Sequence, residues 1–158
     1  MSRRITLYVN GIEREVAVRP DESLLMLLRN QLELTGPRYG CGLEQCGACM
    51  VLVDGVPAYS CTADPVDCSN RSVTTVEGLS PGADRLHPLQ EAFLAEQAGQ
   101  CGYCLSGIIV SAKALLDRNK SPTRAEIAEA LDKHLCRCGT HNRIIAAVQR
   151  AAAEMGVE

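Results

Sequence analysis

The segment 39–50, YGCGLEQCGACM, places three cysteines within nine positions and surrounds them with glycines. Cysteines at this density form disulfides, bind zinc or hold an iron–sulfur cluster. The choice among these three chemistries limits the fold and the function more than any other feature of the sequence.

The start of the chain argues against disulfides. The opening MSRR could begin a secretion signal, and Arg3 and Arg4 resemble a twin-arginine pair, but the following ITLYVNGIEREVAV has no apolar signal core. We therefore expect a cytoplasmic chain, or one that is exported or membrane-associated only with a partner that carries the signal. Because cytosolic thiols are kept reduced, nine cysteines indicate metal or redox chemistry.

Composition makes two other roles unexpected. The 158 residues carry a net charge of −3, with four tyrosines, one phenylalanine and no tryptophan. With so few aromatic residues and no run of lysine or arginine, we expect no nucleic-acid partner. No apolar stretch approaches the ~18 residues that a transmembrane helix needs, so we expect no direct membrane insertion.

Residues 1–80 have the pattern of a small sheet with one helix. Alternating segments with turns at Asn10-Gly11 and at Asp54-Gly55 predict two hairpins. Two further elements are predicted around them: a helix over 22–34 that Asp21 caps and Gly36-Pro37 ends, and a strand over 71–79.

Residues 81–158 are predicted to be helical after a turn-rich linker over 80–88. Apolar periodicity predicts four helices, over 89–99, 104–120, 121–135 and 141–155. Thr123 and Glu126 have the spacing of a capping box at the start of the third. Short links between short helices indicate a small bundle, so the fold class of the whole chain is α+β.

The first half contains a quartet with the spacing C-x4-C-x2-C-x11-C, formed by Cys41, Cys46, Cys49 and Cys61. A C-x4-C-x2-C run followed by a distant cysteine is the plant-type ferredoxin spacing for a [2Fe–2S] cluster. Four thiolates make such a cluster negative, so backbone N–H groups must approach the sulfurs, which glycines permit. Three glycines lie in the loop: Gly40, Gly42 and Gly47. Zinc quartets usually consist of two close pairs, which makes zinc the weaker interpretation.

The second half contains a C-x2-C and a C-x-C that are 31 residues apart, formed by Cys101, Cys104, Cys136 and Cys138. This spacing alone leaves a structural zinc site open. However, Cys104 begins the second predicted helix and Cys138 precedes the fourth. Helix N-termini offer unpaired N–H groups and a positive dipole end, which favour thiolates and a negatively charged cluster.

The motifs CGLEQCGAC, GQCGYCLSG and HLCRCGTHNRI resemble those of the iron–sulfur (2Fe-2S) small subunits of the xanthine oxidase family of molybdenum hydroxylases. The resemblance covers essentially the whole chain, with both quartets in order. It implies a plant-type ferredoxin-like (β-grasp) domain over 1–80 and a four-helix-bundle 2Fe-2S domain over 81–158. The first quartet would bind an outer [2Fe–2S] cluster and the second an inner one.

The same resemblance implies an electron-transfer role for the chain, without an active site of its own. A large catalytic partner would bind a molybdenum–molybdopterin cofactor, and electrons would pass from it through both clusters to an external acceptor. Gln100 and Cys138 are implied to contact the partner's molybdopterin.

One departure from the family pattern points to a branch. Where many members read CRCTGY, residues 136–141 read CRCGTH, which resembles the branch of isoquinoline 1-oxidoreductase and nicotinate dehydrogenase. The branch implies hydroxylation of an N-heterocycle or oxidation of an aldehyde, with a cytochrome c-type or other acceptor subunit. Two alternatives remain, a freestanding two-cluster ferredoxin and a zinc-stabilised interaction module.

Four residues outside the quartets also carry expectations. Cys68 fits neither quartet, so we expect a buried or neutral loop thiol, with a redox sensor as the alternative. His141 is expected near a cluster or at the surface and not as a ligand, because four cysteines already complete each site. His87 and His134 are expected at the surface, at helix ends.

Overall fold

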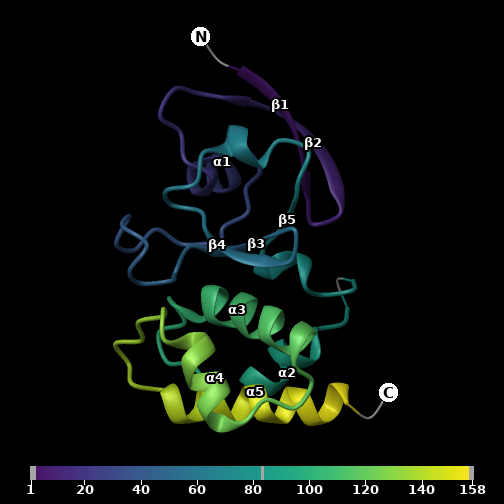
Figure 1. Ribbon diagram of the computed structural model, residues 1–158, viewed down its shortest axis with the longest axis vertical. Helices are drawn as coiled ribbons and strands as arrows, with labels where there is room; N and C mark the ends of the chain where they lie inside the picture. Colours follow the sequence, from purple (N-terminus) through teal and green to yellow (C-terminus); the bar gives the residue numbers. More distant parts are fainter. Residues whose placement is uncertain (1–2, 83, 157–158) are drawn as a thin grey trace.

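The computed structural model describes residues 3–82 and 84–156 and places a β-sheet half beside a helical half (Figure 1). Five strands form one sheet in the order β2-β1-β5-β3-β4. β5 pairs parallel with β1 and antiparallel with β3, so it joins two hairpins into a single sheet. The bounds are β1 Arg3–Val9, β2 Ile12–Val18, β3 Met50–Val53, β4 Val56–Tyr59 and β5 Ser72–Thr74.

Both predicted hairpins are confirmed. β1 pairs antiparallel with β2, and β3 pairs antiparallel with β4. At the turns Asn10 and Asp54 have φ of 52° and 50°, and the glycines that follow, Gly11 and Gly55, have φ of 77° and 79°. Two-residue turns with positive φ match the twist of the flanking strands, which explains why Asn-Gly and Asp-Gly stand at these positions.

The helix predicted in this half is present but shorter. α1 spans Leu24–Asn30 and its N-cap is Ser23, so the prediction of Asp21 as the cap is wrong. Asp21 has φ of 58° and lies in the turn before the helix. The helix also ends well before Gly36, because Glu33 adopts φ of 57° and turns the chain away from the helix axis.

The strand predicted over 71–79 is correct only at its start. The pairing of β5 with its neighbouring strands ends because Thr75 exchanges two hydrogen bonds with the side chain of Asn10, at 2.9 and 3.0 Å. A 3₁₀ turn, η2 over Val76–Gly78, follows at once. A side chain in the first hairpin turn therefore determines where the last strand stops.

The four helices predicted in the second half are all present, as α2 Pro88–Ala95, α3 Leu105–Arg118, α4 Arg124–Leu131 and α5 His141–Met155. The capping box of Thr123 and Glu126 is confirmed, and each side chain bonds the other residue's backbone N–H. The first helix stops at Ala95, earlier than predicted. In the described part of the chain, no helix has the length and apolar character needed to span a bilayer.

The sheet forms a middle layer because β3 is buried on both faces. Val51 and Val53 belong to the core that α1 shares with the strands. Met50 and Leu52, on the opposite face of the same strand, belong to the helical core. α3 consequently lies directly against the sheet (Figure 1). The period-two alternation of β3 thus joins the two halves of the chain.

One glycine pair marks how closely the halves approach each other. A Cβ atom at Gly107, in α3, would lie 2.0 Å from the carbonyl oxygen of Gly47, in the cysteine loop. Because a backbone atom cannot be moved aside cheaply, this approach needs a glycine at position 107.

We predict that Gly107→Ala destabilises the protein by about 1–3 kcal/mol, because overpacking the interface outweighs the ~1 kcal/mol that alanine gains over glycine within a helix. Urea unfolding of the intact metal-loaded chain would measure this. Ser106→Ala is the matched control on the same helix. The buried Ser106 hydroxyl has no hydrogen-bond partner among the described residues, so its removal should be neutral or stabilising. A Gly107→Ala protein as stable as the wild type would contradict the close contact.

Candidate metal centres

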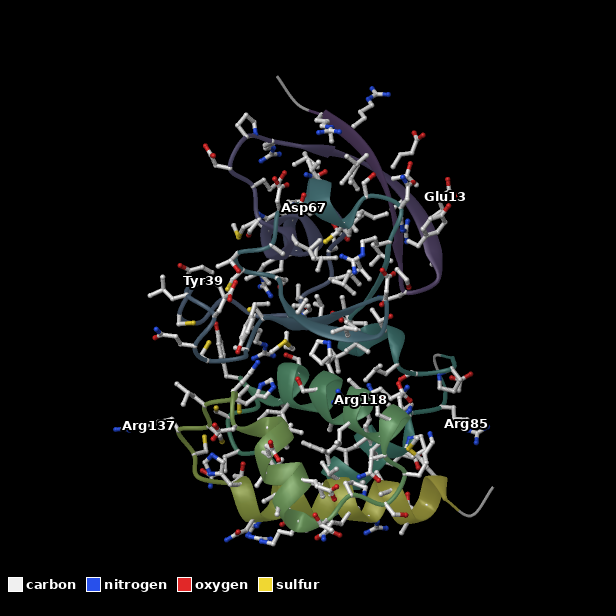
Figure 2. The ribbon with its side chains drawn as sticks, viewed as in Figure 1. Glu13, Tyr39, Asp67, Arg85, Arg118 and Arg137 are labelled. Carbon is white, nitrogen blue, oxygen red and sulfur yellow. The ribbon has the colours of Figure 1, made fainter. Side chains whose placement is uncertain are left out.

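The structure brings each predicted quartet together from two separate segments. The outer quartet combines the 40–49 loop, between α1 and β3, with Cys61, which follows β4. The inner quartet combines the start of α3 with the 136–138 segment between α4 and α5. Figure 2 shows sulfur atoms gathered along the edge that carries Tyr39 and Arg137.

Within the outer quartet the sulfurs lie in two pairs. Cys41 neighbours Cys46, whose Sγ lies 3.4 Å from the Cys41 backbone nitrogen. Cys49 neighbours Cys61. The members of each pair are close enough for one thiol to shift the pKa of the other, so the quartet has two halves, each with two sulfurs.

Backbone N–H groups face the Cys41–Cys46 pair. The amides of Leu43 and Gln45 donate to Cys41 Sγ at 3.3 and 3.2 Å. These amides stabilise the thiolate, and they lower the pKa of Cys41 to about 7. In the other pair, burial raises the pKa of the Cys49 thiol. A raised pKa does not prevent a thiol from binding a metal, because the metal displaces the thiol proton.

The glycines of this loop do what the sequence pattern predicted. Gly42 and Gly47 have φ of 68° and 72°, a region that other residues enter only with strain. Gly40 has a different reason, because a Cβ there would lie 2.6 Å from Cys46 Sγ. Glu44 also has positive φ, 58°, which the sequence pattern did not indicate.

The inner quartet repeats the paired arrangement. Cys101 Sγ and Cys138 Sγ lie 3.4 Å apart, and Cys104 neighbours Cys136. Cys104 is the N-cap residue of α3, which confirms its predicted position. Burial raises the pKa of Cys104 to about 12, whereas the backbone N–H of Tyr103 lowers the pKa of Cys101.

Cys138 lies just before α5, as predicted, and the N-cap residue of this helix contacts the sulfur of Cys136. The N-cap residue is Thr140, and the Thr140 hydroxyl lies 3.4 Å from Cys136 Sγ, whereas Cys138 precedes the helix without forming its cap. Burial opposes ionisation of Cys136, but the hydroxyl and N–H of Thr140 help to lower its pKa to about 7. Each quartet therefore contains at least one thiol whose pKa lies below the ordinary value of a cysteine.

These arrangements fit two-iron clusters. All nine cysteines are free thiols. Among the described residues, no three His, Cys, Asp or Glu side chains are grouped to hold a single metal ion. A tetrahedral zinc needs four ligands around one ion, whereas a [2Fe–2S] cluster takes two protein ligands on each of two irons. Sulfurs gathered in pairs, with N–H groups directed at them, match the second requirement.

Gln100 lies beside the inner quartet. Its side-chain amide points to the Cys138 carbonyl oxygen at 3.5 Å, so the two residues implied to face a partner's cofactor are neighbours. Gln100 is exposed, and it lines an open hollow whose apolar members include Leu94, Leu105 and Ile109.

Cys68 lies apart from both quartets, in the 3₁₀ turn η1, Pro65–Cys68. It is buried in the core beneath α1, which confirms the expectation of a buried thiol. Burial raises the pKa of Cys68, and a thiol that stays protonated is a poor nucleophile.

The three histidines differ in their surroundings. His87 lies at a helix end, as predicted, but it is half-buried, and its Nδ1 accepts the N–H of Leu89 at 3.1 Å. His141 is exposed in the first turn of α5. The prediction for His134 is wrong, because this residue is only 6% exposed.

His134 is buried because it lies between the two halves of the chain. Its Nε2 is 2.8 Å from Ser111 Oγ in α3, and its Nδ1 faces Gly47. Burial lowers the pKa of His134 to about 4, against the effect of the Gly47 backbone, so the ring is neutral at pH 7. No local pattern marks a histidine in a loop as buried.

Two hydrogen bonds connect the loops of the quartets directly. The backbone N–H of Leu135 donates to the Cys46 carbonyl at 3.1 Å. The Tyr103 hydroxyl donates to the Tyr39 carbonyl at 2.5 Å, and the Arg38 guanidinium lies 5.1 Å from the centre of the Tyr103 ring. No sequence pattern indicated these contacts, because their partners are distant in the chain.

Comparison with known proteins agrees with this geometry. The model of the 2Fe-2S iron-sulfur cluster binding domain matches residues 7–74, and that of the [2Fe-2S] binding domain matches residues 75–149. One relative is a subunit of nicotinate dehydrogenase from Pseudomonas putida. It is 53% identical over 152 residues, which cover 96% of each chain.

Two further relatives agree. The alpha subunit of isoquinoline 1-oxidoreductase from Brevundimonas diminuta is 47% identical, over 95% of this chain and 98% of its own. A crystal structure of quinoline 2-oxidoreductase from Pseudomonas putida contains a chain that superposes with a TM-score of 0.94 and 38% identity, over 99% of this chain and 96% of that one. The chain therefore belongs to the 2Fe-2S small subunits of the molybdenum hydroxylases, which carry two [2Fe–2S] clusters and transfer electrons.

Proposed function

We propose that the outer cluster is held by Cys41, Cys46, Cys49 and Cys61 and the inner cluster by Cys101, Cys104, Cys136 and Cys138, within domains that divide near residue 80. The observation that carries this proposal is the pairing of the sulfurs, two and two, in both quartets. Each bound cluster supplies a one-electron redox centre.

The protein residues around each cluster have two tasks. N–H groups such as those of Leu43 and Gln45 compensate the negative charge on sulfur. Burial of Cys49 and Cys104 keeps water away from one side of each centre. Hydrogen bonds to sulfur and solvent exposure are the principal means by which a protein adjusts a cluster potential.

The partner in this proposal is a large molybdopterin-binding subunit that docks at the inner quartet. Gln100 and the Cys138 backbone would meet the pterin, and the apolar hollow beside Gln100 would contact the partner's surface. Relatives named for nicotinate, isoquinoline and quinoline support an N-heteroaromatic substrate for the complex. An aldehyde is the second candidate, because an aldehyde oxidoreductase of Megalodesulfovibrio gigas is 41% identical to the chain over 148 residues.

Hydroxylation of such a ring carbon with oxygen from water releases two electrons and two protons. The chain would pass the electrons singly from its inner to its outer side, and then to a cytochrome c-type or other acceptor subunit. The hydrogen bond from Leu135 to Cys46 supports transfer between the two centres, because it links the segment next to Cys136 with an outer ligand.

Metal analysis tests the cluster assignment. Protein purified without air should contain about four irons and four acid-labile sulfides per chain, because two [2Fe–2S] clusters require them. Iron, zinc and sulfide assays measure this directly. A chain with about two irons and one zinc would contradict the inner cluster and favour a structural zinc site there.

Single cysteine variants test the ligand set. Cys49→Ser should reduce the iron to about half, because it removes one of four ligands of the outer cluster. Cys68→Ser is the matched control, since both thiols are buried in the same half of the chain. It should keep all the iron. Loss of half the iron in Cys68→Ser would show that the outer quartet is assigned wrongly.

Gln100→Ala tests the docking side in the assembled complex. The variant chain should keep both clusters, while the complex should retain less molybdopterin or turn over more slowly. Gln149→Ala, an exposed substitution in α5, is the control and should change neither property. Unchanged molybdenum occupancy together with unchanged turnover in Gln100→Ala would argue against this interface.

A further inference from the structure

His134 occupies the point where the outer loop meets the helical half. A Cβ atom added to Gly47 would lie 2.2 Å from His134 Nδ1, so the imidazole ring packs directly on the loop backbone. On its other side, Nε2 bonds Ser111 of α3 at 2.8 Å. The ring thus spans the distance between a rigid helix and the loop that carries three outer cysteines.

A buried histidine at this position is costly unless its polar atoms are used. Nδ1 is fully buried and makes no hydrogen bond of acceptable geometry to any described residue. An unsatisfied buried nitrogen is unfavourable, and an apolar side chain would fill the same space without that cost. At this position Nδ1 of His134 faces the Gly47 peptide, whose carbonyl oxygen lies against Gly107.

The neighbouring residues give this contact its significance. Leu135, the next residue, donates its N–H to the Cys46 carbonyl. Consecutive residues 134 and 135 therefore contact consecutive residues 47 and 46 of the outer loop. Cys136 follows immediately, so this two-point contact joins a ligand segment of each quartet.

We propose that His134 is a positioning residue. It anchors the Gly47 segment to Ser111 and so sets the separation between the outer and inner quartets. The inference rests on the proposed function, because it concerns two quartets that both hold clusters. A side chain that belongs to neither ligand set thus fixes the separation on which coupling between the two centres depends.

Electron paramagnetic resonance of the full chain, with both clusters reduced, tests this inference. Two nearby paramagnetic centres split and broaden each other's signals, and the effect weakens steeply with distance. His134→Ala should keep the wild-type iron and sulfide content but lose part of this splitting, because the loop loses the contact that His134 makes between Gly47 and Ser111 of α3. His134→Gln should restore the splitting in part, since its amide can still reach Ser111.

The control is His87→Asn, which keeps an N-cap side chain on α2. Arg85, two residues before His87 in the chain, lies on the side of the molecule away from Tyr39 and Arg137 (Figure 2). This variant should have the wild-type spectrum. Full iron content with unchanged splitting in His134→Ala would overturn the inference. So would a fully loaded wild-type chain whose two centres show no interaction.

If His134→Ala loses iron, Ser111→Ala decides the question, because it removes only the anchor of Nε2. Reduced splitting at full iron content would support the positioning role, and wild-type splitting would overturn it. The wild-type iron and sulfide content tests the proposed function separately. A failure of cluster binding is therefore distinguishable from a failure of positioning.

Discussion

Concentrated negative charge on sulfur has to be compensated by backbone N–H groups, and much of the fold serves this requirement. In the outer quartet the backbone itself curves around the thiols. The 40–49 loop does this with positive φ at Gly42 and Gly47 and with the amides of Leu43 and Gln45 on Cys41. A loop of this kind cannot hold its own shape, and the surrounding sheet and helices supply the support.

That support comes from both halves of the chain. β3 leaves the outer loop and is buried on both faces, with Val51 toward α1 and Met50 toward the helical core. The loop is therefore held against α3, where Gly107 permits backbone contact with Gly47. The inner quartet is built at the N-terminal ends of helices, where Cys104 and Thr140 are the N-cap residues of α3 and α5. Loop amides in the outer quartet and helix N-termini in the inner quartet thus both compensate negative charge on sulfur.

The proximity of the quartets follows from the same packing. Leu135 and Tyr103, both from the helical half, donate hydrogen bonds to carbonyl groups of the outer loop. Neither bond involves a ligand side chain, so the ligands remain available for metal. The helical half acts both as a second cluster domain and as one wall of the first.

Features that depend on neighbouring residues could be predicted from the amino-acid sequence. Asn10-Gly11 predicted a hairpin turn, Thr123 and Glu126 a capping box, and the cysteine spacings two quartets, because backbone conformation and ligand spacing are local properties. Other features arise only when distant segments pack together. The side chain of Asn10 ends β5 at Thr75, and the pairing of the inner cysteines and the burial of His134 likewise depend on segments far apart in the chain. Burial is a property of the packed molecule, so no local pattern could show that a loop histidine lies between a helix and a cluster loop.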